Sequence, residues 1–334
     1  MYNVSFPGLG IDLDISNSLS IGNFTIYWYG IIIAVGLILA VIYGCANSKR
    51  FGIDADSLLN CVMVGVVTGI LGARAYYVIF NWDYYGSHLD KILAINEGGL
   101  AIYGGIIGAL LGGLIVGKIC KMNLPALLDV AAIGFLIGQG IGRWGNFFNQ
   151  EAYGIATDLP WGMVSEGTNN IAVHPCFLYE SIWCLLGVLL LHLFSHSKMR
   201  KYNGQIAILY LVWYGLERAI VETLRTDSLM IPGTDNVRVS MVLSLIMVVA
   251  GIFMLIFFKL KGLNNLSLAT AVNDNNDNET ATPQSVASTL GLDDVAENTN
   301  DEVTNEKSQI NESEKTEEEI DVDSILNDVK KYTE

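Results

Sequence analysis

One thirteen-residue segment holds the strongest local pattern of polar side chains that could do chemistry. Residues 142–154 read GRWGNFFNQEAYG, so an arginine, two asparagines and a carboxylate directly follow an apolar run. A charged side chain placed in a bilayer costs about 3 kcal/mol on insertion scales, so such residues tend to be paired, interior and functional. The segment is therefore the first place to look for a site, and Arg143 is its one permanently charged basic residue.

A second group of polar residues recurs along one helical period. Tyr214, Arg218, Glu222 and Arg225 are separated by four, four and three residues, which places them on one face of a helix. Two interpretations stay open here, an internal ladder of ion pairs and a substrate site. Arg74 and Asp129 are isolated in other apolar runs, and each is interpreted as a candidate half of a structural pair.

The elements that position these residues are long apolar runs. The chain has 334 residues, of which 51% are hydrophobic and 16% charged, and about 20 apolar residues span a bilayer. The sequence predicts an all-α integral membrane protein with about seven transmembrane helices. The runs lie at roughly 25–44, 58–80, 100–119, 126–142, 176–194, 206–222 and 239–259.

Lysine and arginine are unevenly distributed among the predicted connections. Nine of them fall on one side, which the positive-inside rule assigns to the cytoplasm. We therefore expect an extracytoplasmic N-terminus, a cytoplasmic C-terminus and an outer connection over about 143–175 that covers a functional site. The nine residues are Lys49, Arg50, Lys118, Lys121, Lys198, Arg200, Lys201, Lys259 and Lys261.

The acidic balance of the chain is confined to its end. Residues 263–334 hold 18 acidic and 4 basic residues, and the net charge of the whole chain is −15. This composition predicts a disordered acidic cytoplasmic tail after a transmembrane catalytic domain at 1–262. Because the acidic excess is in the tail, it carries no information about the membrane site or about nucleic acid, and no nucleic-acid partner is expected.

Segment 142–154 and several shorter segments resemble those of a known family. Segment 142–154 matches the signature G-R-x-G-N-F-x-N-x-E-x-x-G of the bacterial prolipoprotein diacylglyceryl transferases at every fixed position. The resemblance covers about residues 20–260. Further matches follow in chain order: Tyr27-Trp28-Tyr29-Gly30, Gly72-Ala73-Arg74, Gly98-Gly99-Leu100, Asp129, His174-Pro175, Leu178-Tyr179-Glu180, and Tyr214-Gly215 through Arg218 to Glu222.

The resemblance implies an enzyme of the bacterial cell membrane. It implies transfer of a diacylglyceryl group from phosphatidylglycerol to the lipobox cysteine of prolipoproteins, with membrane lipids as surroundings and no cofactor. Arg143 and Arg218 would then stabilise the leaving phosphate. Asn146 and Glu151 would orient Arg143 or the glycerol hydroxyls, Tyr29 and Glu222 would complete the polar wall, and Gly154 belongs to the same signature.

The third predicted span departs from the family pattern. Family members often have histidine before its Gly-Gly pair, in a position proposed to activate the substrate thiol, and this chain has Tyr103 before Gly104. A tyrosine with a reference pKa near 10 is a poor base at neutral pH, although it can donate or relay a hydrogen bond. Tyr103 and Gly104 are kept as candidate site residues. His174 is a further candidate, with a role either as a base or as a cap of the fifth span.

Two other classes of protein compete with a transferase. A secondary transporter for an organic anion would use Arg74, Arg143 and Arg218 at mid-membrane, but the sequence has no inverted repeat to support it. An intramembrane protease would need a Gly-x-Ser-x-Gly serine with histidine, or paired membrane aspartates, and neither pattern is present. The sequence also lacks zinc-ligand spacing, a phosphate loop and a dinucleotide fingerprint, so no metal is expected.

Overall fold

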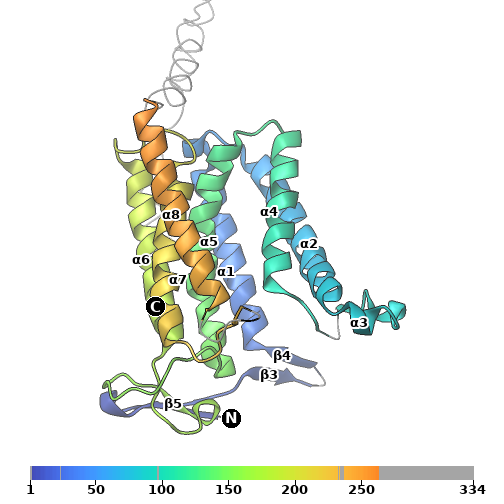
Figure 1. Ribbon diagram of the computed structural model, residues 1–334, viewed down its shortest axis with the longest axis vertical. Helices are drawn as coiled ribbons and strands as arrows, with labels where there is room; N and C mark the ends of the chain where they lie inside the picture. Colours follow the sequence, from blue (N-terminus) through green and yellow to red (C-terminus); the bar gives the residue numbers. More distant parts are fainter. Residues whose placement is uncertain (1, 23, 96–97, 232, 234–236, 263–334) are drawn as a thin grey trace, which may run out of the picture. The chain divides into compact units, whose positions relative to one another are not determined.

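The computed structural model describes residues 2–22, 24–95, 98–231, 233 and 237–262, and these residues are mostly helical (Figure 1). The predicted tail at 263–334 lies outside the described residues. The longer helices are α1 Trp28–Asn47, α2 Ala55–Phe80, α4 Ile102–Ile119, α5 Leu124–Asn149, α6 Cys176–His196, α7 Gln205–Leu224 and α8 Val239–Leu260, and α3 Trp82–Tyr85 is a single turn.

Six helices of the described part of the chain are long and apolar enough to cross a membrane, and α7 is not among them. The prediction of a helical, multi-spanning membrane protein is therefore confirmed at that level. Although α7 has 20 residues, it carries Glu217, Arg218 and Glu222. A seventh crossing by α7 stays a prediction.

The outward faces of the helices suit a lipid environment. Large apolar side chains such as Val249 and Phe253 on α8 and Met63 on α2 are about two-thirds exposed. Exposed apolar surface on this scale is not tolerated in water and marks contact with another apolar phase. The helices therefore present the surface that a bilayer requires.

Helix α5 is longer than the sequence predicted. Its N-terminus is capped by the Asn123 side chain, which accepts a hydrogen bond from the Ala126 amide at 3.1 Å. The helix then continues to Asn149 and ends where Gln150 adopts a left-handed conformation with φ 53°. The prediction of an outer connection from residue 143 is thus wrong over its first part. Arg143 and Asn146 lie on the last turns of α5.

Glycines bring α2 and α4 into backbone contact. A Cβ atom added to Gly104 would lie 2.3 Å from the Gly72 carbonyl oxygen, and one added to Gly108 would lie 2.2 Å from the Thr68 carbonyl oxygen. Only glycine allows this approach, and small residues at four-residue spacing are the usual basis of close membrane-helix packing. The pair α2 and α4 is therefore held by backbone proximity.

Two small sheets lie at one end of the helices, which the sequence analysis did not predict (Figure 1). Strand β1 Tyr2–Phe6 pairs antiparallel with β2 Ile11–Ile15 and with β5 Val164–Ser165, and β3 Ser18–Ile21 pairs with β4 Phe24–Tyr27. We call β1, β2, β5 and the connection at 150–175 the head. Its apolar cluster is completed by the ends of α5 and α6 and consists of Val4, Phe6, Phe147, Met163, Val173 and Phe177.

The main core lies between α5 and its neighbours. Helix α5 packs against α1, α6 and α7, and α7 also packs against α8. Ile133 and Leu136 of α5, Cys184 of α6 and Ile206 of α7 are fully or almost fully buried there. This packing gives the last turns of α5 and α7 and the first turns of α6 fixed positions at the head end.

Candidate active site

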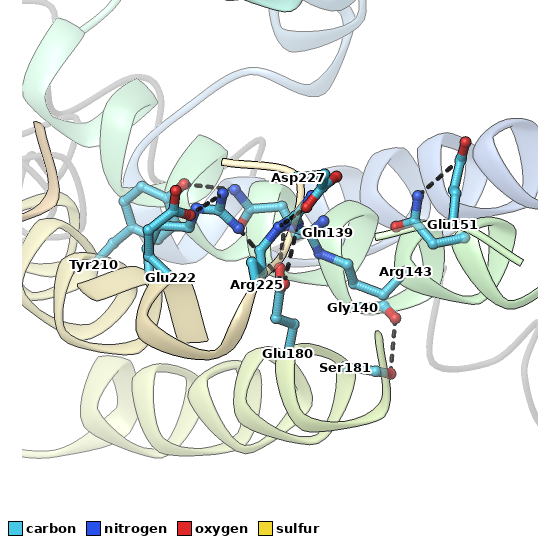
Figure 2. Close-up of polar contacts among 12 residues, drawn as sticks. Gln139, Gly140, Arg143, Glu151, Glu180, Ser181, Tyr210, Glu222, Arg225 and Asp227 are labelled. Carbon is cyan, nitrogen blue, oxygen red and sulfur yellow. Dashed lines mark hydrogen bonds and ion pairs between the residues drawn. The ribbon is translucent and has the colours of Figure 1, made fainter. Parts of the chain in front are cut away.

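The carboxylate of Glu180 is the centre of the site. It lies in the second turn of α6 with 1% of its surface exposed, and three guanidinium groups surround it. Arg143 of α5 pairs with Oε2, and Arg218 of α7 and Arg225 both lie 3.5 Å from Oε1. Figure 2 shows Arg143 and Arg225 directed toward Glu180 from different elements. We call Glu180 and these three arginines the arginine cluster.

Helix geometry supplies a second carboxylate to the cluster. Glu222 lies one turn after Arg218 on α7, is fully buried, and its Oε2 is 2.5 Å from Arg218 Nη2. Arg238, directly before α8, donates a hydrogen bond to the backbone carbonyl of Glu222. The end of α7 therefore meets two arginines, one through a side chain and one through its backbone.

Arg225 is held at the edge of the cluster by Asp227. The guanidinium donates from Nε at 2.9 Å and from Nη2 at 2.6 Å to the two carboxylate oxygens, which is the two-pronged geometry that guanidinium groups favour. Partial burial raises the pKa of Asp227, but the hydrogen bonds and charge of Arg225 outweigh it and hold that pKa below its ordinary value. This pair would be lost only as the pH falls through the lowered pKa.

Arg143 keeps donors that Glu180 does not use. Its ion pair runs through Nη2, and within the described residues no hydrogen bond from Nε or Nη1 is present. The Arg143 side chain has 21% of its surface exposed, against 1% for the Glu180 side chain. Guanidinium donors held in an apolar bundle and only partly used are suited to bind an incoming anion.

The rest of the signature segment forms a separate group beside the cluster. Asn146 and Asn149 each donate a side-chain hydrogen bond to Glu151 Oε1, at 3.1 and 3.2 Å. Figure 2 draws Glu151 apart from Glu180. Glu151 is thus not the ion-pair partner of Arg143. Its carboxylate ties two asparagines together at the end of α5.

The ring of Tyr29 packs against α5 at Gly145. A Cβ atom on Gly145 would lie 2.6 Å from the Tyr29 ring, so the ring packs directly on the α5 backbone. The tyrosine itself is 40% exposed. Tyr29 and Asn146 are therefore both near the head end of α5, at a surface that a ligand can reach.

Gly154 and His174 join the head to the arginine cluster. The Gly154 amide donates to the His174 carbonyl at 2.9 Å, and Gly154 also forms a backbone bridge with Arg225. A Cβ atom on Gly154 would lie 2.7 Å from His174 Cβ and 3.0 Å from Cys176 Sγ. Gly154 is therefore required for close packing beside Arg225.

The His174 side chain does not cap α6. Its Nδ1 lies 3.2 Å from the hydroxyl of Tyr179, which also accepts a hydrogen bond from Trp161 Nε1 at 2.8 Å. The alternative of a capping role is therefore wrong, because α6 begins after Pro175 without a side-chain hydrogen bond. His174 is instead part of a small polar chain in the head.

The structure does not bring Tyr103 to the arginine cluster. Tyr103 lies in the first turn of α4 beside Tyr76 of α2, with 6.5 Å between ring centroids. No hydrogen bond, ion pair or ring contact connects it to the cluster in the described ranges. Gly104, the neighbouring candidate, is used in the contact between α2 and α4.

Arg74 and Asp129 both have structural partners. Arg74 donates to the backbone carbonyls of Lys91, Ile92, Gly98 and Gly99 at 2.7 to 3.0 Å and so organises the segment before α4. Asp129 pairs with Arg200 at 3.3 Å, which confirms it as half of a structural pair. Arg74 has carbonyl groups rather than a carboxylate as partners.

The sequence analysis did not name the centre of the site. Glu180 was noted only as part of a matched tripeptide and Arg225 only as the last residue of a periodic series. One signal was available, because Glu180 is an acidic residue inside the apolar run at 176–194. Its pairing with residues 143, 218 and 225 required the packing of α5, α6 and α7.

Fold and site together define a polytopic helical membrane protein with a buried cluster of guanidinium and carboxylate groups near one end of its helices. The family model described as prolipoprotein diacylglyceryl transferase matches residues 16–257. A phosphatidylglycerol–prolipoprotein diacylglyceryl transferase of Clostridioides difficile is 43% identical over 267 residues, 80% of this chain and 99% of that protein. The protein of the same name from Finegoldia magna is 42% identical over 243 residues, 72% and 95% of the two chains.

A third relative of that name, from Bacillus licheniformis, is 38% identical over 254 residues, which are 73% of this chain and 93% of the relative. The chain belongs to the prolipoprotein diacylglyceryl transferase family. The match to the family model ends at residue 257, before the acidic segment at 263–334.

Proposed function

We propose that this chain transfers the diacylglyceryl group of phosphatidylglycerol to the lipobox cysteine thiol of prolipoproteins. The names of its relatives state the lipid and the prolipoprotein. The observation that carries the proposal is the convergence of Arg143, Arg218 and Arg225 on one buried carboxylate. Burying three guanidinium groups at one point of an apolar bundle is costly, and an anion that binds there would offset the cost.

The chemistry follows from where charge develops. The cysteine thiolate attacks the carbon of the diacylglyceryl group that carries the phosphate ester. A carbon–sulfur bond forms, and the bond from that carbon to the phosphate oxygen breaks. The products are a thioether and glycerol phosphate. Negative charge grows on the phosphate as the bond breaks, and fixed guanidinium groups stabilise it without reorganisation.

Glu180 would hold the three arginines together when no lipid is bound. The phosphate would then compete with the Glu180 carboxylate for the unused donors of Arg143 and for the longer contacts at 3.5 Å from Arg218 and Arg225. Asn146, Glu151 and Tyr29, at the head end of α5, are the groups we assign to the glycerol hydroxyls. We assign to the Tyr103 hydroxyl the role of a hydrogen-bond donor to the peptide substrate.

The test is product formation by the full-length protein in detergent. We expect purified protein to convert phosphatidylglycerol and a lipobox peptide to thioether-linked peptide, followed by mass spectrometry, with stoichiometric glycerol phosphate. A peptide with serine in place of the lipobox cysteine is the control and should give no product. Detergent removes the barrier that a transporter needs, so absence of product from folded protein would reject the transferase and favour anion transport.

We further propose seven crossings, including α7, with an extracytoplasmic head and a cytoplasmic end after α8. The nine lysines and arginines of the connections support this orientation. Alkaline phosphatase folds only outside the cytoplasm, so a fusion after residue 262 should be inactive and one in the connection between α5 and α6 active. An active fusion after residue 262 would overturn the orientation and the side assigned to the site.

A further inference from the structure

Glu217 is a buried carboxylate that the described site leaves without a partner. It lies on α7 beside Arg218, with 2% of its surface exposed. Within the described part of the chain, neither side-chain oxygen has a hydrogen-bond partner and no ion pair includes the group. Glu180 and Glu222 also lack well-oriented hydrogen bonds, but both take part in ion pairs.

The surroundings of Glu217 are those of the arginine cluster. The charged and titratable groups near enough to act on it are Arg143 from α5, Glu180 and Cys184 from α6, Tyr210, Tyr214 and Arg218 from α7, and Arg225 beyond α7. The arginines are already paired with Glu180, Glu222 and Asp227. An ionised Glu217 therefore adds an unpaired negative charge to a buried site, whereas the protonated acid adds none.

A lipid phosphate entering the same arginines increases this imbalance. It brings one more negative charge next to Glu180 and Glu222, and the reaction then creates a second charge on the leaving phosphate. A carboxyl group that holds a proton at that point can deliver it to the leaving oxygen. Among the described residues, no other buried carboxyl group near these arginines lacks both a hydrogen bond and an ion pair.

We propose that Glu217 is the proton donor to the leaving phosphate. This inference rests on the proposed transferase function. As the carbon–oxygen bond breaks, the Glu217 carboxyl transfers its proton to the phosphate oxygen, so glycerol phosphate leaves as a monoanion and Glu217 becomes a carboxylate. The proton lost by the lipobox thiol restores the acid, so each turnover moves one proton from sulfur to phosphate and leaves the enzyme unchanged.

The role differs from a structural one in what a substitution should do. Glu217→Gln keeps the shape of the side chain and its capacity to hydrogen-bond, but its amide cannot transfer a proton as the carboxyl group can. Positioned acids contribute roughly 100-fold to 10,000-fold to rate, so we expect kcat to fall by at least about 100-fold with little change in KM for phosphatidylglycerol. Glu166→Gln, an exposed substitution of the same kind in the head, should leave both constants unchanged.

The pH profile identifies the proton. For the wild type, kcat should rise as the thiol ionises and fall again on the basic side as Glu217 loses its proton. The Glu217→Gln variant should retain the rise and lose the fall. Wild-type kcat or an unchanged basic limb in this variant would overturn the proposal, while no product from the wild type would reject the transferase function itself.

A second variant removes the ambiguity of misfolding. Glu217→Leu replaces an unpartnered buried acid by an apolar side chain, a change that is often neutral or stabilising. We expect it to fold at least as well as the wild type by thermal unfolding in detergent and to show the same loss of turnover per folded molecule. A Glu217→Leu protein with wild-type turnover per folded molecule, whatever its yield, would refute the role.

Discussion

Two buried charged groups lie on the same helix, about 21 Å apart along the axis of α5 at 1.5 Å per residue. The first is the pair of Asp129, near the beginning of α5, with Arg200. The second is the arginine cluster, to which α5 contributes Arg143 near its end. Asp129 accepts hydrogen bonds from the Gly204 amide at 2.8 Å, the Ala207 amide at 2.9 Å and Arg200 at 3.3 Å. Both of its oxygens are used, and together they cap the first turn of α7.

The arginine cluster has the opposite character. Its contacts to Glu180 from Arg218 and Arg225 are long, Arg143 keeps unused donors, and Glu217 is unpaired. The Asp129 carboxylate, with both oxygens bonded, stabilises one arrangement of helices, although Nε of its partner Arg200 has no hydrogen-bond partner among the described residues. A buried polar group that is only partly paired destabilises the folded protein, and a ligand that completes its hydrogen bonds and ion pairs removes this cost. From this difference we propose a structural role for the Asp129 group and a binding role for the arginine cluster.

The largest expected effect is on Arg143. Arg143→Lys should be nearly as damaging as Arg143→Ala, because lysine is a point charge that cannot reproduce two-pronged contact with phosphate oxygens. We expect a loss of about 100-fold or more in turnover per folded enzyme, by analogy with the removal of one oxyanion donor. The measurement is product formation from phosphatidylglycerol and a lipobox peptide.

Arg50→Lys provides a matched control for that substitution. Arg50 lies at the other end of the helices, where its Nε donates to the Ser195 carbonyl at 3.1 Å. Its turnover should remain near that of the wild type. If Arg143→Lys also retains turnover, Arg143 belongs with the structural pairs and the phosphate role passes to Arg218.

Asp129→Asn should affect stability and leave chemistry intact. Removing one partner of a buried ion pair costs about 3 kcal/mol or more, because Arg200 is left unpaired and a capping oxygen of α7 is lost. We expect a lower unfolding temperature in detergent with unchanged turnover per folded molecule. Asp56→Asn, at an exposed position in the first turn of α2, is the control and should change neither quantity measurably.

A fall in turnover of folded Asp129→Asn protein would contradict the comparison between the two charged groups. It would mean that the cap of α7 and the arginine cluster act as one unit, through the position of Arg218. Equal turnover would assign the two ends of α5 to separate tasks.

The smallest expected effect is removal of residues 263–334. Both charged groups lie before residue 263, and the acidic composition of the removed part offers too little apolar surface to offset the entropy cost of ordering it. Truncation after residue 262 should leave turnover nearly unchanged. A truncated protein that inserts and folds normally but has lost activity would show that the acidic tail takes part in the reaction.

Hydropathy and local spacing were readable from the sequence because they depend on near neighbours in the chain. The apolar runs predicted the helices, and the period of Tyr214, Arg218 and Glu222 predicted the face that carries the ion pair of α7. Helix ends were less accessible, since α5 continues through the glycines of its signature segment to Asn149. Its packing against α6 and the head stabilises turns that local propensity alone would not favour.

The short strands of the head carried only a weak local signal. Ile11, Leu13 and Ile15 alternate with Asp12 and Asp14, and this period of two is visible in the sequence. Pairing of β1 with β5, however, joins residues 4 and 165, and such a distant partner has no local signature.

What only the tertiary structure decided is which buried charges are satisfied. The sequence determined that Arg143, Arg218, Glu217 and Glu222 would lie in or beside apolar helices, because each is flanked by apolar runs. It could not determine that Glu180 would meet three arginines while Glu217 met none of them as a partner. Ion pairing depends on distances of a few ångströms between separate helices, and those distances follow from how the whole bundle packs.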